Sequence, residues 1–382
     1  MTTASASRSP GPVFLLALVG LVVTGGWAIA NLMSQGHAAF NGSSTGLMWG
    51  LPIVTYDYFL LTSTGLTMVA SLWTVFGIAA FEPIARRCLW LAVAGLVGGV
   101  AALFLELGHP LRALYAIPLS MQFKAPLFWK VLSVVVYLIA LALLVVGWLM
   151  SAERPRQAPK FAARLALLAA VCITFVAGLV YGMMAMRPFW YGGEVAVAFL
   201  IESFVGGLAF AVFFTYLAHG FNSGSVDAPT RSLFSNVLPK AFAAVIALHI
   251  LFVLARLATG LWSNADGLQV WQRIAGSTSF QLELWIGLVL PLVLMAMPGT
   301  RRSPAMQILA ALLVMVALFA ARYDFIVGGQ LVPLFKGSWV HGLIEYSPSL
   351  TEWLVLAMAI CLANAVNAFG EWKFRIGGGD AR

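Results

Sequence analysis

The chain has little charge for its length. Lys, Arg, Asp and Glu make up only 9% of its 382 residues, and 61% of the residues are apolar. Soluble domains have roughly 45–50% apolar residues, so this composition excludes an ordinary soluble fold. Stretches of roughly 20 apolar residues recur along the chain, and each can span the hydrocarbon of a bilayer as a helix. The sequence therefore predicts an all-α integral membrane protein without a sizeable soluble domain.

Cysteine and histidine are also scarce. The cysteines are Cys88, Cys172 and Cys361, and no two of them are close in the sequence. Iron–sulfur clusters and disulfide frameworks use cysteines at short spacings, so we expect neither in this chain. Of the five histidines only His249 lies well inside an apolar run. A transmembrane b-type haem needs facing histidines from two helices, so we expect no haem and no other metal.

Ten segments have the length and composition of transmembrane helices. They cover approximately residues 12–33, 54–81, 89–107, 126–150, 163–184, 195–220, 241–262, 280–297, 305–327 and 350–369. The first of them has a cleavage-like Ala28-Ile29-Ala30, but its leading segment is only weakly basic, so we expect it to stay as a helix. Residues 108–125 are expected to include an interfacial helix.

Lys and Arg gather in alternate loops. If the N-terminus is cytoplasmic, most of them fall on the inner side, as Arg86, Arg87, Arg301 and Arg302 do. The positive-inside rule then places both termini in the cytoplasm. We expect the chain to be a multi-pass protein of a bacterial inner membrane. The net charge of +8 is a property of these loops, so we expect contact with membrane lipid and no binding of nucleic acid.

Ionisable residues within the predicted helices crowd toward the outer side. Such residues are costly in hydrocarbon, so they usually pair, face a cavity and mark a functional site. They are Asp57, Glu106, Glu202, Arg256, Glu283, Arg322 and Asp324, and His249 lies deeper, near the middle of its helix. A polar cavity that opens to the outside is one interpretation. Paired structural charges that hold helices together are the other.

Three stretches carry a resemblance to a known family. They are Trp49-Gly50-Leu51-Pro52-Ile53 with Tyr56-Asp57-Tyr58-Phe59, Leu105-Glu106-Leu107-Gly108-His109-Pro110-Leu111-Arg112, and Arg322-Tyr323-Asp324-Phe325-Ile326-Val327-Gly328-Gly329-Gln330. Together they resemble the NrfD-type family, the membrane subunits of polysulfide reductase and related complexes. The third stretch is similar to the ten-helix branch, which includes the membrane subunit of some periplasmic hydrogenases. The second departs from the family's acidic-Leu-Gly-basic-Pro signature, with Glu where Asp is frequent and His where Arg is frequent.

The resemblance implies two four-helix bundles arranged as tandem repeats, with flanking helices. On this interpretation residues 1–53 form an N-terminal helix and outer loop, and residues 54–190 form the first bundle with the quinone site. Residues 191–330 form the second bundle, and residues 331–382 form an outer loop and a C-terminal helix.

The resemblance also implies a function. Such subunits bind a quinone, either menaquinone or ubiquinone, near the outer face and exchange electrons with a periplasmic ferredoxin-like iron–sulfur subunit. That subunit connects to a larger catalytic subunit of the molybdopterin or hydrogenase type. Proton uptake would accompany reduction of the quinone, because it takes up two protons with two electrons. Proton translocation across the membrane is an open alternative.

Roles follow for the residues near the outer side. The predicted quinone site contains Tyr56, Asp57, Tyr58, Glu106, His109 and Arg112. Asp57 and Glu106 are its predicted proton-exchanging groups, because carboxyls can be tuned for general acid–base work. His109 could instead cap the preceding helix at a His-Pro corner. In the second bundle, Glu202, His249, Arg256, Glu283, Arg322 and Asp324 are predicted to transfer protons or to form a stabilising network.

Two other functions fit the same composition. Ten helices, a tandem repeat and buried ion pairs also occur in secondary transporters, although their polar sites usually lie near the bilayer midplane. The polar groups here lie toward one rim, which favours quinone chemistry. A passive membrane anchor that never touches quinone is the second alternative.

Overall fold

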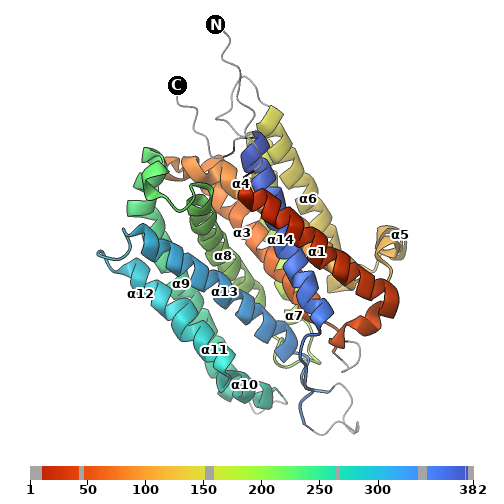
Figure 1. Cartoon of the computed structure of the whole chain (residues 1–382). Helices are drawn as coiled ribbons and strands as arrows, with labels where there is room; N and C mark the ends of the chain where they lie inside the picture. The colour runs from red at the N-terminus through yellow and green to blue at the C-terminus, as the bar shows by residue number, and fades with distance from the viewer. Residues whose placement is uncertain are drawn as a thin grey trace.

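A computed structural model describes residues 11–42, 47–150, 159–262, 267–333, 342–374 and 376. Within these residues the chain is helical and contains no β-strand. The long helices lie side by side and cross the molecule from end to end (Figure 1). Helix α1 begins and α14 ends at the same end of the array, as expected for an even number of spans. We call the opposite end, which carries α5 and α10, the outer end, after the side on which the predicted orientation places it.

The helices match the predicted segments, except that α3 ends at Thr74 and not at 81, α4 begins at Glu82 and not at 89, and α9 begins earlier than predicted. Their bounds are α1 Pro12–Gln35, α3 Leu51–Thr74, α4 Glu82–Glu106, α5 Pro110–Ser120, α6 Pro126–Met150, α7 Lys160–Gly182, α8 Glu194–Ala218, α9 Ala228–Trp262, α10 Leu268–Ala275, α11 Thr278–Leu282, α12 Leu290–Ala296, α13 Pro304–Gly328 and α14 Leu350–Phe374. A π-helical segment, Glu283–Val289 (η4), joins α11 to α12 and makes them one span. Helix α5 lies where the interfacial helix was predicted.

Nine helices of the described residues are long and apolar enough to cross a membrane. Helix α3 is the tenth span. Its Thr, Ser, Tyr and Asp residues lower its hydropathy, but it has 24 residues and its neighbours bury most of them. Helix α9 starts thirteen residues before the predicted 241, since it continues through Pro239. The predicted start was wrong because an interior proline, which removes one backbone hydrogen bond, usually ends or kinks a helix.

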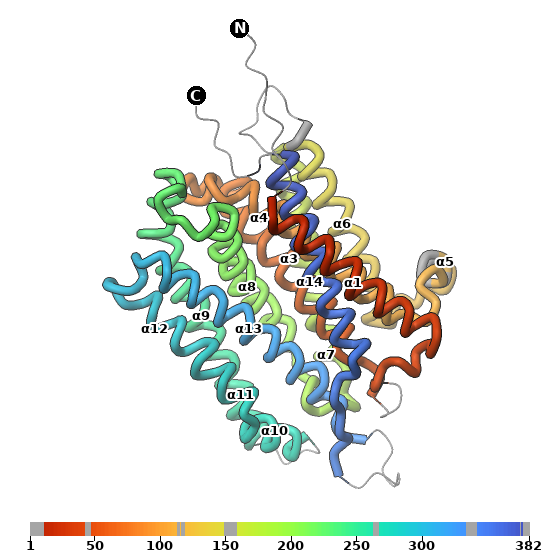
Figure 2. The backbone as a smooth tube through the Cα atoms, viewed as in Figure 1, coloured from red at the N-terminus to blue at the C-terminus, as the bar shows by residue number. Residues whose placement is uncertain are grey.

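The contacts group the central helices into two sets of four. Helix α3 contacts α4 and α7, α6 contacts α7, and the pair α3–α8 joins the two sets. In the second set α8 contacts α9 and α13, and α12 contacts both α9 and α13. Helices α1 and α14 pack against each other, and α14 also contacts α3 and α4 (Figure 2). This arrangement is the expected pair of four-helix bundles with flanking helices.

The junction between the two bundles depends on glycine. At the crossing of α3 and α8, Gly65 lies against the backbone of Ser203 and Gly207 lies against the backbone of Gly65. Small residues allow helix backbones in membranes to approach this closely. A Cβ atom at either glycine would clash with main-chain atoms, which cannot move without separating the helices.

A methyl group at this crossing is expected to destabilise the protein. We expect Gly207→Ala to lower the free energy of unfolding by about 1–3 kcal/mol, the usual cost of overpacking. Thermal unfolding of the purified full chain in detergent measures this. Gly26→Ala is the matched control, because a Cβ at Gly26 of α1 meets nothing within 4 Å. Equal midpoints for the two variants would show that the crossing can relax.

Candidate functional site

The predicted site residues fall into three groups in the outer half of the molecule. The first is a triad around Asp57 within the first bundle, which we call the Asp57 triad. The second is a carboxyl group at the outer end of α4, Glu106. The third is a polar cavity within the second bundle, which we call the second-bundle chamber.

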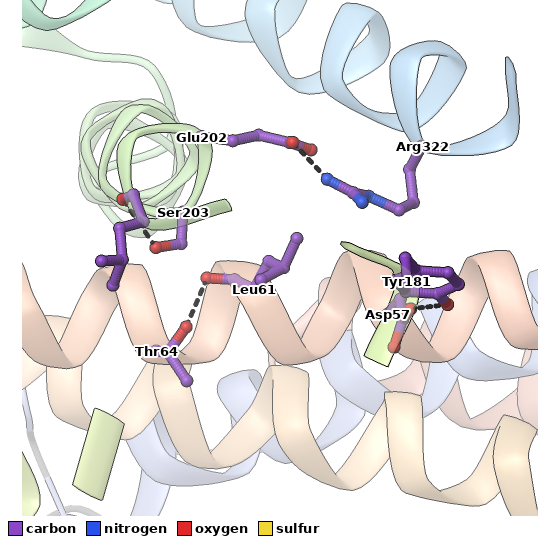
Figure 3. Close-up of polar contacts among 8 residues, drawn as sticks. Asp57, Leu61, Thr64, Tyr181, Glu202, Ser203 and Arg322 are labelled. Atoms are coloured by element: carbon purple, nitrogen blue, oxygen red, sulfur yellow. Dashed lines mark hydrogen bonds and ion pairs between the residues drawn. The ribbon is translucent and has the colours of Figure 1, made fainter. Parts of the chain in front are cut away.

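The Asp57 triad joins three helices of the first bundle. Lys130 of α6 lies 2.7 Å from Asp57 Oδ1, and the Tyr181 hydroxyl of α7 donates to Asp57 Oδ2 (Figure 3 shows the Tyr181 contact). Asp57 is only 1% exposed, and Lys130 is also buried. The Lys130 ammonium also lies 5.0 Å from the centroid of the Tyr56 ring. Each carboxylate oxygen therefore has a donor, and the buried charge is compensated.

Sequence reasoning missed Lys130 and Tyr181 as partners of Asp57. Lys130 lies near the start of its helix, where the sequence alone suggests an outer-loop residue, but its side chain is buried in the bundle. A single cation among the apolar residues of a predicted span is the signal that could have identified it. Tyr181 carries no such signal, since a tyrosine near a helix end is usually an interface anchor.

Aromatic rings connect this triad to the second bundle. The Tyr181 ring packs against Trp190 at 5.1 Å and against Phe325 at 5.3 Å between centroids. Phe325 in turn lies 5.3 Å from the Arg322 guanidinium.

Gln330 joins the loop before α3 to the end of α13. Its side-chain oxygen accepts hydrogen bonds from the backbone N–H groups of Met48 and Trp49.

The six predicted quinone-site residues do not share one pocket. The Tyr56 ring contacts the Lys130 ammonium, which also pairs with Asp57. The Tyr58 hydroxyl instead donates to the Met315 carbonyl of α13 at 2.9 Å. Tyr58 lines an apolar cavity of about 280 Å³ between α3, α4, α8, α13 and α14. His109 and Arg112 are exposed at the corner between α4 and α5, outside the bundle core.

Glu106 is the last residue of α4. Its Oε2 atom is buried and has no hydrogen-bond partner among the described residues. Its backbone carbonyl lies 2.7 Å from His37 Nε2. Glu352 of α14 lies near enough for the two carboxyl groups to interact. A buried carboxyl oxygen without a partner is unusual and marks a place where a ligand or water can bind.

Glu352 holds the outer segments together. It is fully buried and accepts hydrogen bonds from the Tyr346 hydroxyl at 2.6 Å and from the Ser349 backbone N–H at 2.7 Å. Burial, and then the hydrogen bond to the Glu352 carboxylate, raise the pKa of Tyr346 well above its ordinary value. Tyr346 therefore stays a donor, and its oxygen also accepts the Leu51 backbone N–H at the start of α3.

The second-bundle chamber collects all six residues predicted for that bundle. Its volume is about 90 Å³, and its polar lining residues are Glu202 of α8, His249 and Arg256 of α9, Glu283 of η4, and Arg322 and Asp324 of α13. Arg322 forms an ion pair with Glu202 across the chamber (Figure 3). The structure therefore brings these six side chains together around one space.

Several polar atoms of the chamber lack protein partners. Both ring nitrogens of His249, the Nε and Nη1 atoms of Arg322, and Asp324 Oδ2 are buried without a hydrogen bond within the described part of the chain. Buried polar groups are nearly always hydrogen-bonded, so we expect water or a polar ligand to bind these atoms in the chamber. Glu283 begins the π-helical segment, and such segments often occur at functional sites.

The two bundles place charged groups on corresponding helices. In the first bundle, Asp57 on the first helix meets Lys130 on the third and Tyr181 on the fourth. In the second bundle, Glu202 on the first helix faces the same chamber as Glu283 on the third and Arg322 on the fourth. This correspondence supports the tandem repeat, although the residue types differ.

Metal ligation receives no support from the described ranges. They contain no group of three or more His, Cys, Asp or Glu side chains arranged to hold a metal ion. Cys88, Cys172 and Cys361 are all free thiols.

Comparison with known proteins gives one family and several relatives. The family model described as "Polysulphide reductase, NrfD" matches residues 40–334. A selenate reductase subunit of Mesobacillus selenatarsenatis is 23% identical over 354 residues, covering 80% of this chain and 80% of that protein. The Hdr-like menaquinol oxidoreductase integral membrane subunit of Archaeoglobus fulgidus is 21% identical over 360 residues, covering 88% and 87%. The matched range contains the Asp57 triad, Glu106 and the second-bundle chamber.

Proposed function

Because the chain belongs to the NrfD family of polysulphide reductase membrane subunits, we propose that it is the quinone-interacting membrane subunit of a multi-subunit respiratory oxidoreductase. One relative is named as a subunit of selenate reductase and another as the membrane subunit of a menaquinol oxidoreductase. The second name favours menaquinone over ubiquinone as the quinone.

The observation that carries this proposal is the unpartnered oxygen of Glu106 at the outer end of α4. A quinone has polar oxygens on an apolar ring and tail, so its site must combine a buried polar group with access from lipid. Phe104 and Leu111, on either side of Glu106 in sequence, are 42% and 71% exposed. Glu106 therefore lies where an apolar carrier can reach a half-buried carboxyl group that has one buried, unpartnered oxygen.

A quinone bound there would supply two-electron redox chemistry that the chain itself lacks. Glu106 is proposed to hold and exchange the proton at one quinone oxygen, which is general acid–base work. His109 and Arg112, exposed at the next corner, are proposed donors to a ring oxygen. Asp57 is assigned to positioning α3, because both of its oxygens already have donors.

The second-bundle chamber is proposed to exchange protons with the outer side. It offers three carboxyl groups and a buried imidazole within one cavity. A complete path across the membrane would have to continue inward through hydroxyl groups and water.

The proposed partners are a ferredoxin-like iron–sulfur subunit docked at the outer end and a larger catalytic subunit beyond it, of the molybdopterin or hydrogenase type. The expected setting is a bacterial inner membrane with both termini in the cytoplasm, because that orientation places most Lys and Arg inside.

Purification of the tagged full chain from its own membranes in mild detergent tests the proposal. We expect an iron–sulfur protein and a larger subunit to co-elute, and the complex to oxidise or reduce an added naphthoquinone. A solitary chain that binds no redox partner would contradict the proposal and favour a transporter. A stable complex that never reacts with quinone would favour a passive anchor.

A further inference from the structure

The second-bundle chamber is not closed. A larger cavity of about 660 Å³ adjoins it, and we call this cavity the outer groove. Both cavities are lined by Phe189, Phe252, Arg256 and Trp271, so they meet at these four side chains. The groove lies between the outer part of α9, α10 and the segment that links α7 to α8.

The outer groove is open to the surroundings of the protein. Ala255 and Thr259 of α9 and Tyr191 of the α7–α8 segment line it and are exposed. The outer part of α9 and α10 lie at the outer end of the array (Figure 1). A molecule at this end of the protein can therefore enter the groove, which shares Arg256 with the chamber.

Arg256 stands between the two cavities. Its Nη2 atom donates to the Phe189 carbonyl at 3.0 Å, and its Nε atom lies 3.8 Å from Glu194 Oε1. The guanidinium also lies 5.4 Å from the Trp271 ring and 5.2 Å from the Phe325 ring. These contacts hold a cationic donor against aromatic walls at the entrance of the chamber.

The inner end of this space is a built polar site. His249 is 4% exposed and Arg322 is 1% exposed, and their unpartnered nitrogens lie on the chamber. Phenylalanines and a tryptophan complete much of the remaining wall. Apolar walls with a few convergent polar groups are typical of small-molecule sites.

Size and charge narrow the class of ligand. The chamber alone is smaller than the roughly 300–1,000 Å³ of ordinary ligand pockets, but chamber and groove together fall within that range. The chamber carries two guanidinium groups and three carboxyl groups, so an anionic headgroup would increase its excess of negative charge. A neutral ring with acceptor oxygens can accept hydrogen bonds from the unpartnered nitrogens of His249 and Arg322 without adding negative charge.

We propose that the outer groove and the second-bundle chamber bind a second quinone or quinol, with His249, Arg256 and Arg322 as the residues that would hold its oxygens. The proposal takes its ligand class from the proposed function but needs no role for Glu106. Two quinone sites would then lie on the same side of the membrane, one in each bundle.

A steric plug tests the site without altering any polar group. Ala255 lines the groove and is exposed, so Ala255→Trp fills the entrance. Ala258 lies on the same helix, is exposed and lines neither cavity, so Ala258→Trp is the matched control. The probe is a photoreactive azido-naphthoquinone added to the full chain in lipid nanodiscs, with labelled peptides mapped by mass spectrometry.

We expect the native chain to be labelled in two regions, near the end of α4 and in the α9–α10 region. Ala255→Trp should reduce α9–α10 labelling by about tenfold or more, as a steric penalty above roughly 1.4 kcal/mol requires. Labelling near α4 should persist in that variant and serves as its folding control. Ala258→Trp should keep both labels.

Each other outcome overturns one or both of the proposals. Labelling near α4 alone, in all three proteins, would overturn the second site and leave the proposed function intact. Equal α9–α10 labelling in the two variants would also overturn it. Labelling of α9–α10 that excess anionic phospholipid abolishes would identify a lipid headgroup site instead. Labelling of α9–α10 alone would overturn the site at Glu106, and labelling of neither region would overturn both.

Discussion

Replacing Glu106 with Gln is expected to lower quinol-linked electron transfer by about 10²–10⁴-fold, the usual contribution of a positioned acid or base. The amide keeps the size and the hydrogen-bonding capacity of the side chain but cannot exchange a proton. Because Oε2 has no protein partner among the described residues, the substitution removes no contact that holds the fold. The measurement is quinol oxidation or quinone reduction in membranes, normalised to the amount of assembled complex.

Two variants make this test specific. Glu106→Asp retains a carboxyl group, and the family frequently has Asp at this position, so we expect it to keep much of the activity. Glu82→Gln is the matched control, since Glu82 is an exposed carboxyl at the opposite end of the same helix. Turnover at the native rate in Glu106→Gln would remove Glu106 from the mechanism.

The course of the chain through the membrane was largely predictable from hydropathy. Nine spans are apolar runs, and α3 was predicted as a span although its Thr, Ser, Tyr and Asp residues lower its hydropathy. The start of α9 was missed for a local reason. Proline usually ends a helix, yet Pro239 lies inside α9, where tertiary packing outweighs one lost hydrogen bond.

The candidate site was only partly predictable, because depth along a helix can be read from sequence but rotation and lateral neighbours cannot. The second-bundle residues share both depth and direction, so they meet in one chamber. In the first bundle Asp57 faces Lys130 and Tyr181, whereas Tyr58, one residue later, faces α13. Consecutive helical residues point in different directions, so a run of polar residues does not line one pocket.

Pairing of buried charges depends on which helices are neighbours, and this order is absent from a single sequence. Asp57 and Lys130 are 73 residues apart. Asp57 was predicted to exchange a proton because its carboxyl group was placed in the quinone site. Because the Lys130 ammonium lies 2.7 Å from its carboxylate, the proposed role of Asp57 becomes structural. The contribution of this ion pair to the free energy of unfolding can be measured.

Lys130→Met is expected to destabilise the protein by about 3–5 kcal/mol, because it leaves the Asp57 carboxylate buried and without its cation. Methionine is close in length to the lysine stem, so little packing is lost. The free energy of unfolding can be followed by denaturant titration of the purified full chain in detergent. Lys124→Met is the matched control, since Lys124 is exposed between α5 and α6, and it should change stability by less than about 0.5 kcal/mol.

The double variant Asp57→Asn with Lys130→Met tests whether the loss of stability comes from the unpaired charge or from the loss of the ion pair itself. Replacing both members of a buried ion pair is often nearly neutral, so we expect much of the lost stability to return. The Tyr181 hydroxyl can still donate to the amide oxygen introduced by Asp57→Asn, which keeps α3 and α7 joined. If Lys130→Met were no less stable than Lys124→Met, the Asp57 charge would not depend on this partner. If the double variant were stable but lost quinone-linked turnover, Asp57 would regain the proton-exchanging role that its sealed position argues against.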